Sequence, residues 1–150
     1  MIIEVRNEDE MKAFGARLAK HLSGGEVIEL VGDVGSGKTT LTKGIALGLG
    51  VDEDVQSPSF TISRVYDARD GLTLAHYDFY RLGQAGIMAD EIRETILNPH
   101  TVTVIEWGDI VEGALPTDRL TLNIMSPTET DRRITVQAYG PKSIKIEHAL

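Results

Sequence analysis

The chain has 150 residues, of which 41% are hydrophobic, and we expect one globular domain over residues 1–150 with a single core. Its 15 Lys and Arg residues against 23 Asp and Glu residues give a formal net charge of −8, which disfavours strong independent binding to nucleic acid. The absence of cysteine excludes disulfides, thiolate metal sites and cysteine nucleophiles.

The first ten residues lack the pattern of a targeting signal. They read MIIEVRNEDE, which is acidic where a secretory signal is basic and then apolar. No apolar run approaches the roughly 20 residues that cross a bilayer. We therefore expect a cytoplasmic protein that makes no membrane contact.

A strand and then a helix are predicted at the N-terminus. Residues 1–5 favour a short edge strand, and Asn7 is suited to cap a helix. Glu10 lies three residues further on, where its side chain can bond back to the Asn7 N–H as in a capping box. The buried stripe of this helix is expected to contain Met11, Phe14, Leu18 and Leu22.

The next segment carries the strongest motif of the chain. A strand at residues 26–31 leads into GDVGSGKTT at residues 32–40, which satisfies the phosphate-loop pattern G-x-x-x-x-G-K-[ST]. Leu41, Ile45 and Leu49 then fall on one face of a helix. Strand, loop and helix thus follow in the order that a phosphate site requires. The alternative is a glycine-rich turn before a buried helix.

Each residue type in this loop has a physical reason. Glycines let the backbone take positive φ and bring its N–H groups around a phosphate, next to the positive end of the following helix. Lys38 can reach the β- and γ-phosphates, and the Thr39 hydroxyl can coordinate a Mg²⁺ that bridges them.

A β-hairpin is predicted after the phosphate-loop helix, with strands at residues 60–66 and 72–79. Its first part is rich in hydroxyl groups and is a candidate switch segment that senses the γ-phosphate. The switch candidates are Ser57, Ser59 and Thr61. On the second strand His76, Asp78 and Tyr80 share one face. The alternative is a surface hairpin in which Asp78 pairs with Arg81.

The second half of the chain contributes a further acidic signal. A helix is expected at residues 89–97, followed by a buried strand at residues 102–105 that ends in Glu106, where phosphate sites often place an acid that holds Mg²⁺. Trp107 is either a core anchor or a platform beside the nucleotide or a partner. Two alternating strands follow at residues 120–124 and 134–138, and residues 144–146 are expected to add a last short strand.

Taken together, the motifs GDVGSGKTT, SPSFT, HYDFYRL and VIEWGD resemble the TsaE family, also called YjeE, of small bacterial ATPases. The resemblance covers nearly the whole chain. The family usually has S-P-T in its second motif, and here Ser59 stands where Thr is expected, which keeps the hydroxyl and loses a methyl group.

The resemblance implies an α/β fold of the P-loop NTPase type. This fold has three layers, with a central, mostly parallel sheet, helices on both faces and antiparallel hairpins. It also implies Mg²⁺-dependent ATP hydrolysis in the formation of N6-threonylcarbamoyladenosine in tRNA. Proteins of that family act on the TsaD and TsaB proteins and do not modify tRNA themselves. Because the parts for binding are visible but no arginine is clearly placed to complete the site, we expect weak activity alone and stimulation by partners.

The resemblance also implies roles for individual residues. The catalytic residues would be Lys38, Asp78 and Glu106, with Thr39 and Glu106 as Mg²⁺ ligands and Asp78 as either a Mg²⁺ group or a group that positions water. Arg133 would lie near the nucleotide, and Arg132 is an equally plausible register. The ATP-binding residues would be Gly35, Ser36, Gly37, Lys38, Thr39, Thr40, Glu106, Trp107, Gly108, Asp109 and Arg133.

Three other functions fit a phosphate loop. A small-molecule or nucleoside kinase needs a second substrate pocket and an arginine-rich lid, and no arginine cluster of that kind occurs in the sequence. A GTP-dependent switch needs guanine-reading motifs such as N-K-x-D, which are absent, so ATP is preferred. A non-catalytic module that binds nucleotide and docks to partners is the third.

Overall fold

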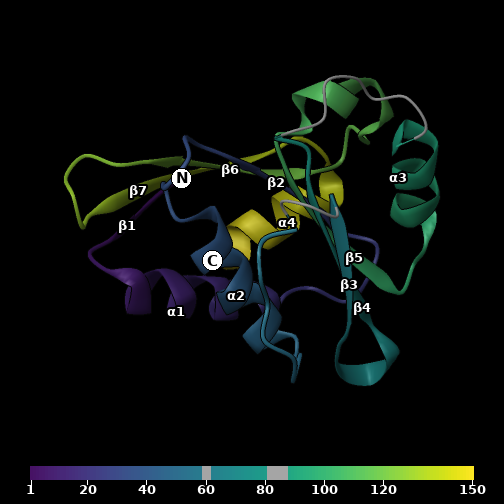
Figure 1. Cartoon of the computed structure of the whole chain (residues 1–150), viewed down its shortest axis with the longest axis horizontal. Helices are drawn as coiled ribbons and strands as arrows, with labels where there is room; N and C mark the ends of the chain where they lie inside the picture. Colours follow the sequence, from purple (N-terminus) through teal and green to yellow (C-terminus); the bar gives the residue numbers. More distant parts are fainter. Residues whose placement is uncertain (59–61, 81–87) are drawn as a thin grey trace.

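A mixed seven-stranded sheet forms the centre of the computed structural model, which describes residues 1–58, 62–80 and 88–150 (Figure 1). The strand order is β1-β7-β6-β2-β5-β4-β3. In chain order the strands are β1 (Ile2–Val5), β2 (Val27–Val31), β3 (Ser63–Asp67), β4 (Thr73–Asp78), β5 (Thr101–Glu106), β6 (Leu120–Met125) and β7 (Arg132–Ala138).

The four central strands, β6, β2, β5 and β4, run parallel, and the outer strands pair antiparallel on both sides. The centre is parallel and the antiparallel pairs lie outside it, which agrees with the predicted mostly parallel sheet with antiparallel hairpins. The predicted hairpin is β3 and β4, and β4 also pairs with β5 in parallel. Parallel pairing brings the carboxyl ends of the central strands to one edge of the sheet, where ligands of α/β folds bind.

Helices cover both faces of the sheet, as predicted (Figure 1). One core cluster joins α1, α2 and α4 to the sheet, and a second lies under α3 and the 3₁₀ segment Gly108–Ala114. The described α-helices are α1 (Glu8–Ala19), α2 (Lys38–Gly48), α3 (Met88–Leu97) and α4 (Pro141–Ala149). No helix in these described parts is long and apolar enough to cross a membrane.

Helix α1 begins at the predicted cap with one difference in its hydrogen bonds. The Asn7 side chain accepts from the Glu10 N–H at 2.9 Å. The Glu10 carboxylate accepts from the N–H of Arg6 at 3.1 Å, where the capping-box prediction named the N–H of Asn7. The chain entering the helix is still held by a reciprocal pair of bonds.

The C-terminal segment is helix α4, and the predicted strand at residues 144–146 is wrong. Pro141 occupies the first turn, where its missing N–H costs nothing. The Asp118 carboxylate caps the helix by accepting from the N–H groups of Lys142 and Ser143, at 2.9 and 3.0 Å. Burial alone would raise the pKa of Asp118, but the hydrogen bond with the Ser143 side chain, these two N–H bonds and the positive charge of Lys142 together outweigh it and lower the pKa. The strand was predicted from the alternation of Ile144 and Ile146, and this local pattern carries no information about a cap supplied by Asp118.

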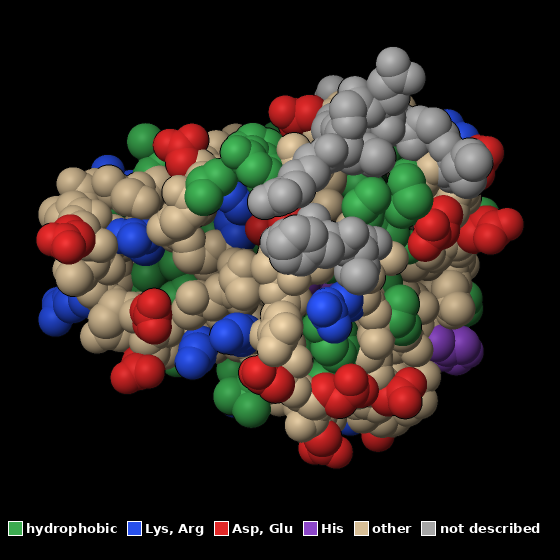
Figure 2. Space-filling model, viewed as in Figure 1, with side chains coloured by type: hydrophobic (Ala, Val, Ile, Leu, Met, Phe, Trp, Pro, Cys, Tyr) green, Lys and Arg blue, Asp and Glu red, His purple; other side chains and the backbone are tan. Residues whose placement is uncertain are grey.

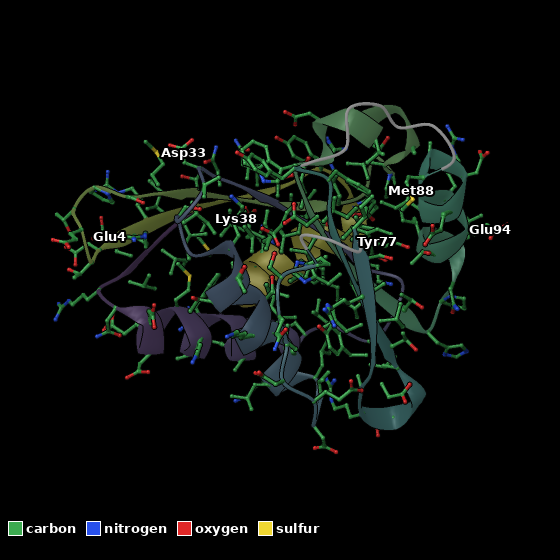
Figure 3. All side chains as sticks on the ribbon, viewed as in Figure 1. Glu4, Asp33, Lys38, Tyr77, Met88 and Glu94 are labelled. Atoms are coloured by element: carbon green, nitrogen blue, oxygen red, sulfur yellow. The ribbon has the colours of Figure 1, made fainter. Side chains whose placement is uncertain are left out.

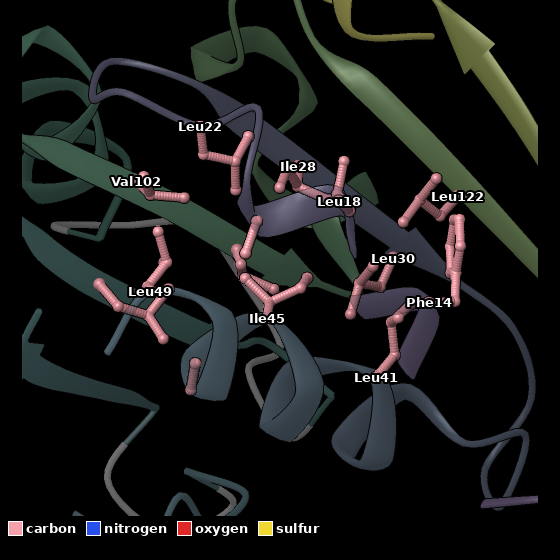
Figure 4. Packing of buried hydrophobic residues seen from close by; sticks show 14 of the residues in the cluster. Phe14, Leu18, Leu22, Ile28, Leu30, Leu41, Ile45, Leu49, Val102 and Leu122 are labelled. Carbon is pink, nitrogen blue, oxygen red and sulfur yellow. The ribbon is translucent and has the colours of Figure 1, made fainter. Parts of the chain in front are cut away.

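Helices α1 and α2 pack against each other and against the sheet (Figure 4). The predicted face of α2 is confirmed, since Leu41, Ile45 and Leu49 are all fully buried. The helices approach closely because glycines lie at the contact. A Cβ on Gly15 would come within 2.7 Å of the Leu41 carbonyl oxygen, and a Cβ on Gly44 would meet the Lys12 backbone. This contact sets the position of α2 and thus of the loop before it.

We predict that Gly44→Ala lowers the free energy of unfolding by about 1–3 kcal/mol, measured by urea denaturation. Helix propensity alone would raise it by about 1 kcal/mol. Packing decides the sign, because the added Cβ would lie 2.8 Å from the Cα of Lys12 and backbone atoms cannot rotate away. The control is Gly113→Ala, whose Cβ meets nothing within 4 Å and whose effect should stay within about 0.5 kcal/mol. A stabilised Gly44→Ala variant would contradict the close approach.

Candidate functional site

The loop between β2 and α2 follows a path that requires glycine. Gly35 and Gly37 have φ of 82° and 106°, in the left-handed region that side chains disfavour. A Cβ on Gly32 would come within 2.8 Å of the carbonyl oxygen of Ile124. Gly37 is also the N-cap of α2, and no side chain caps that helix end. The first N–H groups of α2 therefore remain available to an anion.

Lys38 lies over this loop and is only 6% exposed. Its ammonium group donates to the carbonyl oxygens of Gly32 and Asp33, at 2.5 and 3.0 Å. It also lies 4.8 Å from the centre of the Trp107 ring. Figure 3 labels Lys38 where α2 begins, at the centre of the molecule. An ammonium group has three N–H donors, so two loop carbonyls leave one for a ligand.

A pocket of about 480 Å³ opens beside the loop, within the range of small-molecule sites. It brings together residues from the loop, α1, the segment before β3, the ends of β4 and β5, and the start of β7. Of the predicted site residues, it is lined by Gly35, Gly37, Lys38, Thr39, Thr40, Ser57, Asp78, Glu106 and Trp107. The loop, the hydroxyl groups and the carboxylates thus line one pocket.

Other predicted residues lie elsewhere. Ser36, Gly108 and Asp109 line a neighbouring pocket of about 430 Å³ between the loop, the start of the 3₁₀ segment and the end of β6. Ser59 and Thr61 fall outside the described residues, as does Arg81, so the predicted switch contacts of these two hydroxyls and the alternative Asp78–Arg81 pair stay predictions.

Two carboxylates meet at the ends of β4 and β5. The register pairs Asp78 with Glu106 across the two parallel strands, and both line the 480 Å³ pocket. The Asp78 carboxylate accepts from the Ser57 hydroxyl at 3.3 Å and from the Tyr80 N–H at 3.0 Å. Glu106 is 3% exposed and hydrogen-bonded to His76 at 2.6 Å. Both acids are therefore held in defined orientations.

His76 is the contact for which the sequence assigned no role. Strand alternation placed it on the same face as Asp78, but its partner Glu106 is 30 residues away and on another strand. The signal that could have found it is the parallel register, which is not visible in a single strand.

The oxygen atoms of this pocket fit Mg²⁺ bound together with a phosphate. The described residues contain no cluster of three or more His, Cys, Asp or Glu side chains able to hold a metal alone. Mg²⁺ is usually bound through one or two carboxylates and the phosphates of a substrate. The Thr39 hydroxyl and the carboxylates of Asp78 and Glu106 supply this kind of donor set.

The structure brings Arg132 to the site, and not Arg133. The Arg132 guanidinium donates to the Ser36 carbonyl oxygen at 3.0 Å, and this residue lines the pocket. Arg133 instead pairs with Glu4 of the edge strand β1, at 3.0 Å; Figure 3 labels Glu4 far from Lys38. Consecutive residues of β7 face opposite sides of the sheet, so only one of the two arginines can face the loop, and that residue is Arg132.

Trp107 is half-buried, packs against the second core cluster and also lines the pocket. Its φ of 59° is unusual for a residue with a side chain, and it directly follows Glu106. Its ring lies 5.0 Å from the ring of Tyr80 and borders both pockets. Both alternatives for Trp107 therefore have support, since the residue packs against the core and also borders the pocket.

Comparisons with known proteins agree with the motifs. The family described as threonylcarbamoyl adenosine biosynthesis protein TsaE matches residues 5–134. A tRNA threonylcarbamoyladenosine biosynthesis protein TsaE from Bacillus subtilis is 40% identical over 139 residues, which cover 89% of this chain and 83% of the relative. The protein of the same name from Streptomyces coelicolor is 39% identical and covers 88% and 93%.

A solved structure is also similar over most of its length. The crystal structure of YdiB from Bacillus subtilis is 35% identical, with a TM-score of 0.81 over 99% of this chain and 93% of that one. Fold, motifs and sequence identity thus agree, and the chain belongs to the TsaE family.

Proposed function

We propose that this protein is a Mg²⁺-dependent ATPase that acts on the TsaD–TsaB complex in the formation of N6-threonylcarbamoyladenosine in tRNA. One observation carries the proposal. The uncapped start of α2, with its positive-φ glycines, opens into the same pocket as two carboxylates placed side by side by β4 and β5. The relatives' names support the pathway.

The loop binds the triphosphate in this proposal. Backbone N–H groups from Gly35 to Thr39 surround the β-phosphate, and the positive end of α2 adds to their attraction. Lys38 donates a hydrogen bond to the β- and γ-phosphates. It uses either its third N–H or one of the two N–H groups that bond to loop carbonyls in this structure. These contacts leave the γ-phosphate pointing to the ends of β4 and β5.

The acids then complete the site. Thr39 and Glu106 would hold Mg²⁺, which neutralises charge on the β- and γ-phosphates. Asp78 orients the attacking water, because its own carboxylate is fixed by Ser57 and by the Tyr80 N–H. A fixed acceptor favours the aligned geometry that in-line attack needs.

Hydrolysis by the isolated protein is expected to be slow. Arg132 is the arginine that the described residues bring to the pocket, and its guanidinium donates to the backbone carbonyls of Ser36 in the loop and of Thr128, Glu129 and Asp131. It therefore positions the loop and does not stabilise charge on the departing phosphoryl group. A partner protein that supplies such a group would accelerate the reaction.

The charge distribution supports a protein partner over direct tRNA binding. The net charge is −8, and Figure 2 shows carboxylates interspersed with Lys and Arg on the face drawn, gathered along its lower edge. Tight RNA binding rests on clustered cations that neutralise phosphates. In the proposed function the TsaD–TsaB complex, and not this protein, contacts the tRNA.

We predict slow ATP hydrolysis by the protein alone and faster hydrolysis when TsaD and TsaB are added, measured as phosphate release with excess Mg²⁺. Lys38→Ala and Glu106→Ala should each lower the stimulated rate by about 100-fold or more, the effect of removing one charge-stabilising group. No hydrolysis under either condition would reduce the protein to a nucleotide-binding module. Transfer of phosphate to a nucleoside in a parallel panel would instead indicate a kinase.

We predict that Arg132→Ala weakens ATP binding by about tenfold or more, measured by titration calorimetry, because the loop loses a charged hydrogen bond of about 1.5–3 kcal/mol. Arg133→Ala is the matched control. This substitution removes an exposed ion pair between Arg133 and Glu4. Such a pair contributes at most about 1 kcal/mol to stability, and it lies away from the loop. Equal losses of affinity in the two variants would contradict the assignment.

A further inference from the structure

His76 is fully buried and hydrogen-bonded to the carboxylate of Glu106. Its Nε2 lies 2.6 Å from Glu106 Oε2. On β4 it lies two residues before Asp78, on the same face, and the register pairs it with Val104 of β5. The imidazole therefore reaches across the sheet to the acid at the end of the next strand.

The other ring nitrogen decides the direction of this bond. His76 Nδ1 is buried and has no hydrogen-bond partner among the described residues. A proton on Nδ1 would be a buried donor without an acceptor, which is costly, whereas an unpaired acceptor lone pair costs less. The proton is thus assigned to Nε2, and His76 donates to Glu106.

This donation leaves the two carboxylate oxygens of Glu106 in different situations. Oε2 is engaged by His76, and within the described parts of the chain no other side chain or backbone group bonds to this carboxylate. Glu106 lines the pocket beside Lys38 and Thr39. The oxygen left for a ligand is Oε1.

We propose that His76 is a positioning residue for Glu106. Its Nε2–H fixes the carboxylate so that Oε1 is presented to the Mg²⁺ that accompanies ATP. Groups that hydrogen-bond to metal-ligating side chains typically contribute 10–100-fold to metal affinity or activity. This inference rests on the proposed ATPase function, and it makes β4 the strand that orients both acids, Asp78 directly and Glu106 through His76.

A packing role alone would not require these features. His76 lies between Leu74 and Asp78 on a face whose buried neighbours include Val104, where an apolar ring of similar size would fill the same space. Instead the site accepts an unpaired Nδ1 in the core. The two roles are separated by variants that keep or remove the donor.

The experiment compares His76→Phe, which keeps the volume without a donor, with His76→Gln, which can place an N–H near the position of Nε2. Binding of a non-hydrolysable ATP analogue is measured by calorimetry in EDTA and at saturating Mg²⁺, and the ratio of the two Kd values gives the gain from Mg²⁺. Thermal melts report folding.

Thr103→Val is the matched control. Thr103 is buried on β5, its hydroxyl has no hydrogen-bond partner among the described residues, and its side chain faces the opposite side of the sheet from Glu106. The Thr103→Val substitution removes a buried polar atom from β5, the strand that carries Glu106, without changing the pocket. The gain from Mg²⁺ in this variant should therefore equal that of the wild type.

We expect His76→Phe to bind the analogue normally in EDTA and to lose about 10–100-fold of the gain from Mg²⁺, and His76→Gln to restore most of it. An unchanged gain in His76→Phe, or an equal loss in Phe and Gln variants, overturns the inference. If His76→Phe does not fold, His76→Met takes its place. A wild type with no gain from Mg²⁺ would instead overturn the proposed function.

Discussion

The backbone path between β2 and α2 is the constraint on which the site depends. Positive φ at Gly35 and Gly37 turns the chain so that α2 starts without a side-chain cap, and its free N–H groups face the pocket. The position of α2 is in turn set by the glycine contact with α1, which seats the helix against the sheet. A surface made of backbone atoms thus depends on a helix–helix contact whose glycines, Gly15 and Gly44, do not line the pocket.

The parallel register of the central strands brings two carboxylates to the pocket beside the loop. It places Asp78 beside Glu106 at the carboxyl ends of β4 and β5, with His76 two residues before Asp78 on the same face. Trp107 follows at once with a positive φ, and its ring lies near the Lys38 ammonium and Tyr80. Unusual backbone conformations are typical of sites where the surrounding structure fixes a functional geometry. Here the strain lies one residue after the acid that we propose holds Mg²⁺.

The features predicted correctly from the sequence are those that depend on residues close together in the chain. The strand, glycine loop and helix around Lys38 and the buried face of α2 were readable from the sequence, because each depends on spacing within a few residues. Contacts between distant segments were not readable. The choice of Arg132 over Arg133 depends on which side of β7 faces the loop, the cap of α4 comes from Asp118, and the partner of His76 lies on another strand. The pairing of β1 with β7 likewise joins the two ends of the chain, which no single segment encodes.

The central claim is that backbone amides of this loop, Lys38 and one Mg²⁺ hold a triphosphate between β2 and α2. A crystal structure with Mg²⁺ and a non-hydrolysable ATP analogue tests it most directly. The β-phosphate oxygens should then lie about 2.7–3.2 Å from the N–H nitrogens of Gly35, Gly37 and Lys38, with the cation next to Thr39 and Glu106. A nucleotide bound elsewhere, with the loop free of phosphate, would contradict it.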